Sequence, residues 1–260
     1  MSLRATNYYR PTTLEDAYRK LKENPKNSLV AGGLWMKKMG MTYDTLIDLS
    51  NLGLDQIKEE KDYIHVGSMV SLREFEKNPA INGLFSGKTA FAVREILGPA
   101  FRNIATIGGS IYGRYPFSDV ICGLLPLDVK VKLYPENEMS LNDFINYRGK
   151  IDGIITEIVI KKEEGKGFYK KVKTTALDFP LINFSIVKRN HKNYIAIGSR
   201  PMVAALAVKA MEEADKGNFE KAAEIAAEEL QYMDSMNISK AYRQDLVRVY
   251  VRRGLEEVNK

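Results

Sequence analysis

Residues 102–120, RNIATIGGSIYGRYPFSDV, constrain the fold more than any other part of the chain. They place two adjacent glycines, Gly108 and Gly109, in a stretch that is otherwise typical of an apolar strand. Glycine weakens a strand interior and adds nothing to a core, so the pair indicates a bend or a close approach of the backbone to another group. A second pair, Gly32-Gly33, follows the apolar run SLVA in the same way. We therefore expect two loops of similar construction, each at the end of a strand.

Both loops have the chemistry of an anion site. Glycine permits a positive φ and leaves the backbone without a Cβ, so successive N–H groups can converge on a phosphate. Thr106 and Ser110 add hydroxyl groups for phosphate or ribityl oxygens, and Asp119 can accept hydrogen bonds from sugar hydroxyls. Two facing loops of this kind can hold both halves of a pyrophosphate. Taken alone, either pair fits an ordinary strand-end turn better, and that alternative stays open at this point.

Hydrophobic periodicity predicts an α+β chain of two domains. Residues 1–160 form the first domain, with subdomains of about 1–55 and 56–160 in which strands alternate with helices. Two helix starts are explicit: Thr13 has the position of an N-cap, and Ser71 with Glu three residues later has the spacing of a capping box. Residues 161–260 form the second domain, in which three antiparallel strands precede a set of helices.

Composition excludes several classes of protein. Hydrophobic residues make up 45% of the 260 residues and charged residues 28%, which is typical of a globular protein rather than a disordered one. The single cysteine, Cys122, excludes a disulfide framework and a cysteine-ligated metal cluster within the chain. The net charge of +6 is spread over interleaved lysines and glutamates, so we expect no nucleic-acid partner.

The membrane is not an expected partner either. No segment reaches the roughly 20 apolar residues of a membrane span, and the start MSLRATNYYR lacks the apolar core of a signal peptide. We therefore expect a cytoplasmic protein.

Motifs that carry catalytic side chains are missing from the sequence. It contains no GxxxxGK[ST] phosphate loop, no GxGxxG after the first strand, no HExxH and no G-x-S-x-G elbow. The two histidines, His65 and His191, fall in a strand and in a hairpin connection, where a structural role is expected. We therefore expect no histidine-based acid–base mechanism and no metal site.

Six segments in chain order carry a family resemblance: YYRPTTLEDA, VAGGLWMKKM, VGSMVSLREFE, FRNIATIGGSIYGRYPFSD, LLPLDVKVKL and AYRQDLVRVYVRRGLEEV. Together they resemble the FAD-binding medium subunit of the molybdenum hydroxylases, the family of xanthine dehydrogenase and carbon monoxide dehydrogenase. The similarity covers nearly the whole chain, and the second Gly-Gly loop with its trailing Ser118-Asp119 is its most specific part. It implies a two-part FAD-binding domain of the PCMH or vanillyl-alcohol-oxidase-like type, followed by a C-terminal α+β domain.

The resemblance also implies which residues bind FAD. The two loops surround the pyrophosphate, Asp119 contacts the cofactor, Ile96 lies near the flavin ring, and Phe179 covers a face of the ring. The full set expected at the cofactor is Leu29, Val30, Ala31, Gly32, Gly33, Leu34, Trp35, Met36, Ile96, Thr106, Ile107, Gly108, Gly109, Ser110, Ser118, Asp119 and Phe179.

Each of the two loops departs from the family pattern. Leu34 and Trp35 stand where the family has small polar residues, so the first loop is expected to bind through its backbone N–H groups rather than its side chains. Ser110 replaces the usual asparagine in the second loop. Both changes leave the glycines in place.

The function implied by the resemblance is electron transfer through FAD within a hetero-oligomer. The implied partners are a molybdopterin-binding large subunit and a [2Fe–2S] small subunit, with NAD as the usual acceptor of the family. The hard chemistry in such a protein belongs to the cofactor, in agreement with the missing acid–base motifs. Two alternatives remain: a stand-alone flavin reductase of the same fold, and a non-catalytic module that has lost FAD.

Overall fold

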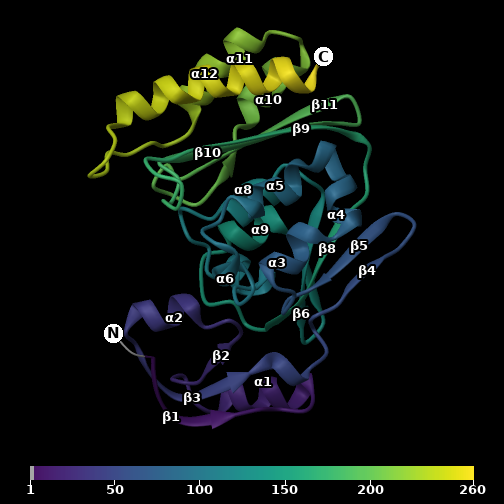
Figure 1. The fold of residues 1–260 in the computed structure, drawn as a ribbon, viewed down its shortest axis with the longest axis vertical. Helices are drawn as coiled ribbons and strands as arrows, with labels where there is room; N and C mark the ends of the chain where they lie inside the picture. Colours follow the sequence, from purple (N-terminus) through teal and green to yellow (C-terminus); the bar gives the residue numbers. More distant parts are fainter. Residues whose placement is uncertain (1–2) are drawn as a thin grey trace.

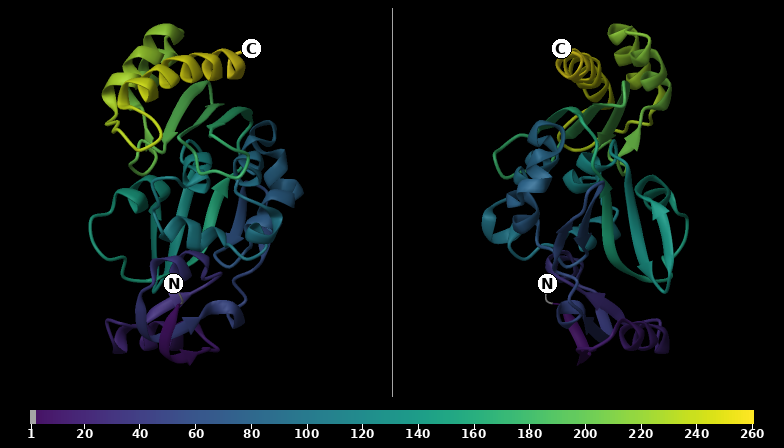
Figure 2. Two further views of the ribbon diagram at one scale, coloured as in Figure 1. Left: turned by 60° about the vertical axis from the view of Figure 1, so that its left-hand side comes forward. Right: turned by 90° about the vertical axis from the view of Figure 1, so that its right-hand side faces the viewer.

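The computed structural model describes residues 3–260 and arranges them in three tiers along the long axis of the molecule (Figure 1). The N-terminal tier lies at the bottom of that view, a layer of strands and helices lies in the middle, and the C-terminal helices lie at the top. The two further views show the same order of tiers (Figure 2). The two ends of the chain are therefore in opposite tiers.

The N-terminal tier is a small parallel sheet with its strands in the order β1-β3-β2. The first helix begins where the sequence predicts, since the Thr13 hydroxyl accepts a hydrogen bond from the Asp16 amide at 3.1 Å. The elements of this tier are β1 (Arg4–Tyr9), α1 (Leu14–Glu23), β2 (Ser28–Val30), α2 (Leu34–Met39), β3 (Thr42–Asp48) and the 3-10 turn η1 (Leu49–Asn51).

The middle tier contains an antiparallel sheet of five strands in the order β4-β5-β8-β6-β7. Its strands are β4 (Ile57–Glu59), β5 (Tyr63–Gly67), β6 (Val129–Tyr134), β7 (Asn137–Ser140) and β8 (Ile154–Lys161). In β6 buried residues alternate with more exposed ones, because one face of the strand packs on the core.

Short helices complete the middle tier. The predicted capping box at Ser71 is present, because the Ser71 side chain accepts from the Glu74 amide and the Glu74 side chain accepts from the Ser71 amide. The helices are α3 (Leu72–Lys77), α4 (Pro79–Gly83), the 3-10 turn η2 (Leu84–Gly87), α5 (Lys88–Arg94), α6 (Pro99–Arg102), α7 (Ile107–Tyr112), α8 (Asp119–Leu124) and α9 (Leu141–Asn146).

The second Gly-Gly pair lies in a different kind of element from the strand-end loop that the sequence predicts. Gly108 and Gly109 lie in the first turn of α7 rather than at the end of a strand, and α6 precedes them. The Thr106 hydroxyl caps this helix by accepting from the Gly109 amide at 3.1 Å. A good N-cap and the apolar residues that follow the glycines, Ile111 among them, favour the helix over the extended form.

The C-terminal sheet has four strands rather than the three predicted, in the order β12-β11-β10-β9. The added strand, β12, has only two residues and pairs with β11, so it is too short to show a period in the sequence. The elements are β9 (Gly165–Val172), β10 (Ile182–Arg189), β11 (Lys192–Gly198), β12 (Ala205–Leu206), α10 (Val208–Asp215), α11 (Phe219–Glu229) and α12 (Lys240–Val258).

Both faces of this sheet are covered (Figure 1). Phe184 and Ile186 of β10 pack in one cluster with Val251 of α12. Val187 of the same strand and Tyr169 of β9 belong instead to the core of the middle tier. The sheet therefore joins the C-terminal helices to the layer that contains the two loops.

Among residues 3–260 no helix combines the length and the apolar character needed to cross a membrane.

Candidate functional site

The first glycine loop connects β2 to α2. Gly33 is the N-cap of α2, has φ 66°, and makes no side-chain cap hydrogen bond. A Cβ on Gly32 would lie 2.1 Å from the carbonyl oxygen of Ile104, so this glycine is required by close packing against the backbone that leads into the second loop. The two loops are therefore direct neighbours, and the contact between them is made by backbone.

The amides at the start of α2 are available for a ligand. The first amides of any helix have no acceptor within the helix. In the part of the chain that the structure describes, those of Leu34, Trp35 and Met36 have no other acceptor either. These amides supply positive partial charge to the cavity that their residues line.

The amides of the second loop are already used by the protein. Ile107 donates to the Val70 carbonyl at 3.0 Å and Gly108 to the Ser68 carbonyl at 2.9 Å. Gly109 donates to the Thr106 hydroxyl, and Ser110 donates to the Thr106 carbonyl at 3.0 Å. Helix capping and contacts with Ser68 and Val70 thus occupy these donors, and the convergence of the N–H groups of both loops on one anion stays a prediction.

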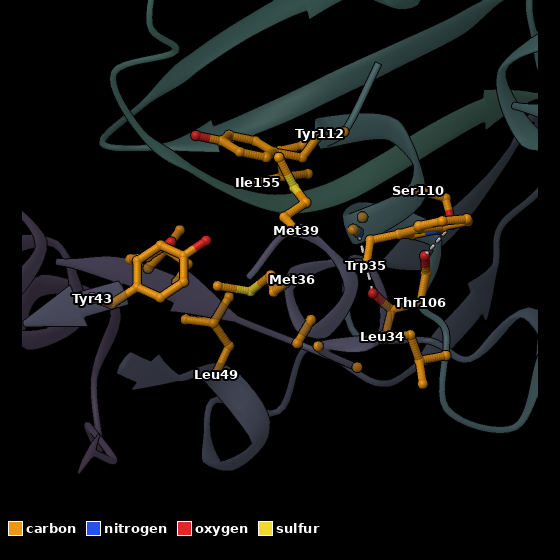
Figure 3. Close-up of a pocket in the computed structure, with 18 of the residues that line it drawn as sticks. Leu34, Trp35, Met36, Met39, Tyr43, Leu49, Thr106, Ser110, Tyr112 and Ile155 are labelled. Carbon is orange, nitrogen blue, oxygen red and sulfur yellow. Dashed lines mark hydrogen bonds between the residues drawn. The ribbon is translucent and has the colours of Figure 1, made fainter. Parts of the chain in front are cut away.

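A cavity of about 580 Å³ lies between the two loops, a size within the usual range for small-molecule sites. Figure 3 shows Met36, Tyr43 and Leu49 gathered at one side of it, and Trp35 beside Thr106 and Ser110 at the other. The walls are mainly apolar.

Three polar side chains lie on the wall of this cavity. Lys26 and Lys150 lie on it and give it positive charge. The Ser68 hydroxyl, also on the wall, is buried and has no hydrogen-bond partner among residues 3–260. An apolar cavity that also carries basic side chains and unpaired hydrogen-bond donors is suited to a long ligand that is partly aromatic and partly anionic.

A smaller pocket adjoins the large cavity. Trp35, Ser110 and Tyr115 line both spaces, so they form the boundary between them. Trp35 also belongs to an aromatic cluster with Phe101, Tyr115, Phe117 and Phe179, in which the Phe117 and Phe179 ring centroids are 4.6 Å apart.

The Asp119 carboxylate is buried at the edge of the smaller pocket and has three protein partners. Tyr169 and Asn183 donate to its Oδ1 at 2.6 and 2.8 Å, and the Lys171 ammonium donates to its Oδ2 at 2.8 Å. Burial, reinforced by this carboxylate, raises the pKa of the Tyr169 phenol well above its ordinary value, so the phenol remains a donor. A direct contact between Asp119 and a cofactor stays a prediction.

The predicted site residues fall into three groups. The large cavity brings together Leu29, Ala31, Gly32, Gly33, Leu34, Trp35, Met36, Thr106, Gly108, Gly109 and Ser110. The smaller pocket contains Ile96, Ser118, Asp119 and Phe179, together with Trp35 and Ser110. Val30 and Ile107 line neither space, and Ile107 is fully buried in the core.

Several residues of the site were not predicted. Ser68 follows Gly67 in the segment VGSMVSLREFE, which was noticed only as part of a family pattern. Lys171 lies in the run YKKVK, whose charges are typical of an exposed strand, so nothing local marks it as buried. Arg102, which lies beside the site without lining either space, is part of the fourth family segment, yet its burial depends on a partner 26 residues away, Glu76.

Among residues 3–260 there is no group of three or more His, Cys, Asp or Glu side chains placed to hold a metal ion.

Comparison with known proteins decides the family. Residues 4–161 match the family described as "FAD binding domain in molybdopterin dehydrogenase". The chain belongs to this family. Its two glycine loops are therefore those of a flavoprotein family. The predicted family and its predicted cofactor, FAD, are both confirmed.

Individual relatives agree with this assignment. The chain is 26% identical to the nicotine 6-hydroxylase medium subunit of Paenarthrobacter nicotinovorans, in an alignment that covers 99% of this chain and 98% of that protein. It is 27% identical to the nicotinate dehydrogenase FAD-subunit of Eubacterium barkeri over 67% of this chain and 66% of that protein. The relatives are thus FAD or medium subunits of oxidoreductases.

Solved structures confirm the type of fold. A chain of carbon monoxide dehydrogenase from Hydrogenophaga pseudoflava superposes with a TM-score of 0.89, at 21% identity and over 99% of this chain and 98% of that one. A chain of quinoline 2-oxidoreductase from Pseudomonas putida 86 gives a TM-score of 0.88 at 19% identity, over 99% of this chain and 98% of that one. At these identities the likeness shows the fold alone.

Proposed function

We propose that this protein is the FAD-binding electron-transfer subunit of a molybdenum-containing hydroxylase or dehydrogenase. The observation that carries the proposal is the 580 Å³ cavity between the two glycine loops, with the unpaired amides of α2 on its wall. Membership of a flavoprotein family supplies the identity of the ligand.

The residues present fit FAD. The amides of Leu34, Trp35 and Met36 and the nearby lysines would hold the anionic pyrophosphate, and the Ser68 hydroxyl is an unused hydrogen-bonding group on the same wall. The apolar side chains around Tyr43 would exclude water from an aromatic part of the ligand. Backbone donors thus replace the polar side chains that Leu34 and Trp35 lack.

The chemistry that FAD supplies when bound is electron transfer between the iron–sulfur clusters of a partner subunit and an acceptor such as NAD. The chain itself binds the cofactor, orients it and shields it from water. The proposed partners are a molybdopterin-binding large subunit and a [2Fe–2S] small subunit, because a relative of nearly full coverage is a medium subunit of a hydroxylase.

A visible absorption spectrum tests the flavin part of the proposal. The purified protein, reconstituted with FAD and freed of excess, is expected to show the flavin bands at about one FAD per chain. A protein that takes up no FAD would contradict the proposal and favour the non-catalytic module.

A pair of charge-reversal variants then locates the binding site. Lys150→Glu lies on the cavity wall, whereas Lys61→Glu changes an exposed lysine elsewhere by the same net charge. We expect Lys150→Glu to raise the Kd for FAD roughly thirty-fold, because the reversal changes the charge by two units and each nearby unit charge contributes about 1 kcal/mol, and Lys61→Glu to leave it unchanged. Equal effects of the two variants would place FAD away from the cavity.

Native purification tests the complex. The protein isolated from its own cells is expected to carry molybdopterin and [2Fe–2S] subunits with it. Recovery as a free flavoprotein under the same conditions would instead favour the stand-alone reductase.

A further inference from the structure

The large cavity has an unusual share of the methionines. Four of the ten in the chain line it: Met36, Met39, Met41 and Met69. Figure 3 shows Met36 and Met39 pointing into it from α2. Thioether side chains are flexible and polarisable, so they form an apolar wall that adapts to the shape of a ligand. Their sulfur atoms can also be oxidised to sulfoxides, so this wall can be changed chemically.

Met39 and Met41 are the accessible members of the group. They are 54% and 48% exposed, whereas Met36 and Met69 are less exposed. Gly40 lies between them with φ 63° and ends α2, so the chain turns there toward β3 while both side chains stay on the one cavity. An oxidant in solution must reach the sulfur atom before it can react. These two thioethers are therefore the ones on the wall that it meets first.

Each of the two sulfur atoms accepts a hydrogen bond from a tyrosine that lines the same cavity. The Tyr115 hydroxyl donates to the Met39 Sδ at 3.8 Å, and the Tyr43 hydroxyl donates to the Met41 Sδ at 3.7 Å. Burial raises the pKa of both phenols, so they remain donors. A thioether is a weak acceptor, whereas a sulfoxide is polar. The two phenols are therefore expected to hold the oxygen of an oxidised side chain at the wall.

We propose that Met39 and Met41 are oxidation sites, at which hydrogen peroxide lowers the affinity of the cavity for its aromatic ligand, the FAD of the proposed function. In this reaction the O–O bond of peroxide breaks and one of its oxygen atoms forms the S=O bond. The thioether sulfur loses two electrons, and the other oxygen leaves as water. The inference rests on the proposed function for the identity of the ligand, but not for the chemistry at sulfur.

The effect on binding follows from polarity. A sulfoxide adds an oxygen atom and a dipole to a wall whose apolar side chains otherwise exclude water from the ligand. Covering such a group with an aromatic ring removes it from water, which costs free energy. Because sulfoxide reductases return methionine sulfoxide to methionine, the loss of affinity is expected to be reversible.

A pair of double variants tests the proposal. Met39→Leu with Met41→Leu removes both sulfur atoms and keeps the wall apolar. Met233→Leu with Met236→Leu is the matched control, because these methionines are 46% and 104% exposed and line neither pocket. Each full chain is treated with hydrogen peroxide, its sulfoxides are located by peptide mass spectrometry, and its Kd for FAD is measured before and after the treatment.

The unmodified protein is expected to form sulfoxides at Met39 and Met41, and its Kd for FAD should rise on the order of ten-fold, because the new polar groups lose water when the ligand binds. Incubation with sulfoxide reductases for both epimers should restore the Kd. The Met233/Met236 double variant should respond in the same way. The Met39/Met41 double variant should have the same Kd before and after peroxide.

A second readout needs no flavin. Trp35 is the only tryptophan of the chain and lines the same cavity. Its ring centroid lies 5.4 Å from that of Tyr115, the hydrogen-bond partner of Met39. Oxidation of Met39 should therefore change the Trp35 fluorescence of flavin-free protein, and the Met39/Met41 double variant should show no such change. The peptide map verifies that the Trp35 ring itself is not oxidised.

The outcomes separate the two proposals. A protein that binds no FAD before treatment would contradict the proposed function, while a fluorescence change that depends on Met39 and Met41 would still support the oxidation sites. Intact thioethers at both positions when Met236 is fully oxidised would overturn the inference. An unchanged Kd with both sulfoxides present would also overturn it, as would an equal rise of the Kd in the Met39/Met41 double variant, which indicates damage elsewhere.

Discussion

Gly32 packs against the carbonyl group of Ile104 so closely that a Cβ on the glycine would lie 2.1 Å from that oxygen. The contact connects two segments 72 residues apart and holds the first loop against the approach to the second. The first Gly-Gly pair is therefore needed for backbone packing, in addition to any role in binding a ligand.

Gly32→Ala is therefore expected to lower the free energy of unfolding by about 3 kcal/mol, because the added methyl group forces one backbone away from the other. Gly109→Ala is the matched control in the second loop, since its Cβ would meet only the Thr106 hydroxyl, at 3.0 Å, and alanine favours the helix. We expect a change of less than about 1 kcal/mol for the control. Chemical denaturation of flavin-free protein measures both, and equal stability of the two variants would contradict the backbone contact.

Gly108→Val, by the same reasoning, should damage the fold before it affects a ligand. A Cβ on Gly108 would lie 2.5 Å from the Ser68 Cβ and 2.7 Å from the Ser68 carbonyl oxygen. The sequence suggests that a branched side chain here would block a phosphate, but the structure puts protein at that place. Loss of flavin in this variant should therefore be accompanied by a loss of stability of at least about 3 kcal/mol, and flavin loss at full stability would restore the first explanation.

Ser68→Ala is expected to act in opposite directions on stability and on FAD binding. The Ser68 hydroxyl is buried without a partner in the described chain, so its removal should raise the free energy of unfolding of flavin-free protein by about 1 kcal/mol. The same change should weaken FAD binding if the hydroxyl serves the cofactor, which titration measures. Ser110→Ala offers the contrast, because its hydroxyl donates to the Thr106 carbonyl at 2.7 Å and its removal should destabilise the protein by about 1 kcal/mol. A destabilised Ser68→Ala variant would show that the hydroxyl has a partner after all.

Local signals in the sequence predicted the parts of the fold that short stretches determine. The caps at Thr13 and Ser71 are set by hydrogen bonds to amides three residues later, and both are present. The hairpin between β10 and β11 was also expected, and its two turn residues, Asn190 and His191, have φ 48° and 61°. These features need no knowledge of the rest of the chain.

The parts of the site that the sequence missed depend on distant partners. Lys171 is buried because Asp119, 52 residues earlier, and the Glu95 carbonyl accept hydrogen bonds from its ammonium group. Gly108 was interpreted as a place where the backbone approaches a ligand, yet the neighbour in the structure is the Ser68 backbone, 40 residues away. Residue type and spacing indicate that a backbone must come close to another group, but they do not say whether that group is a ligand or another part of the chain.

Cys122 is expected to be unreactive in the folded protein. Its thiol is fully buried, and burial, reinforced by the Asp119 carboxylate, raises its pKa well above the ordinary value. Because the thiolate is the reactive form, a thiol reagent at neutral pH should label the native protein only as it unfolds. Labelling in denaturant, at one thiol per chain, is the control, and fast labelling of the native protein would contradict the burial of this residue.

The ionised Glu213 carboxylate is expected to raise the free energy of unfolding. This contribution should be lost in acid over a defined range of pH. Asn218, Lys221 and Lys216 donate to its carboxylate and lower its pKa from the ordinary 4.5 to about 2. Because the folded-state pKa is the lower one, the contribution is complete above about pH 4.5 and disappears as the pH falls through about 2. Glu213→Gln should therefore unfold more easily than the unmodified protein at neutral pH, with the difference shrinking steadily below pH 4.5. Glu212→Gln, an exposed neighbour on α10, is the control that should show no such trend, and denaturation curves that stay parallel down to pH 2 would contradict the assignment.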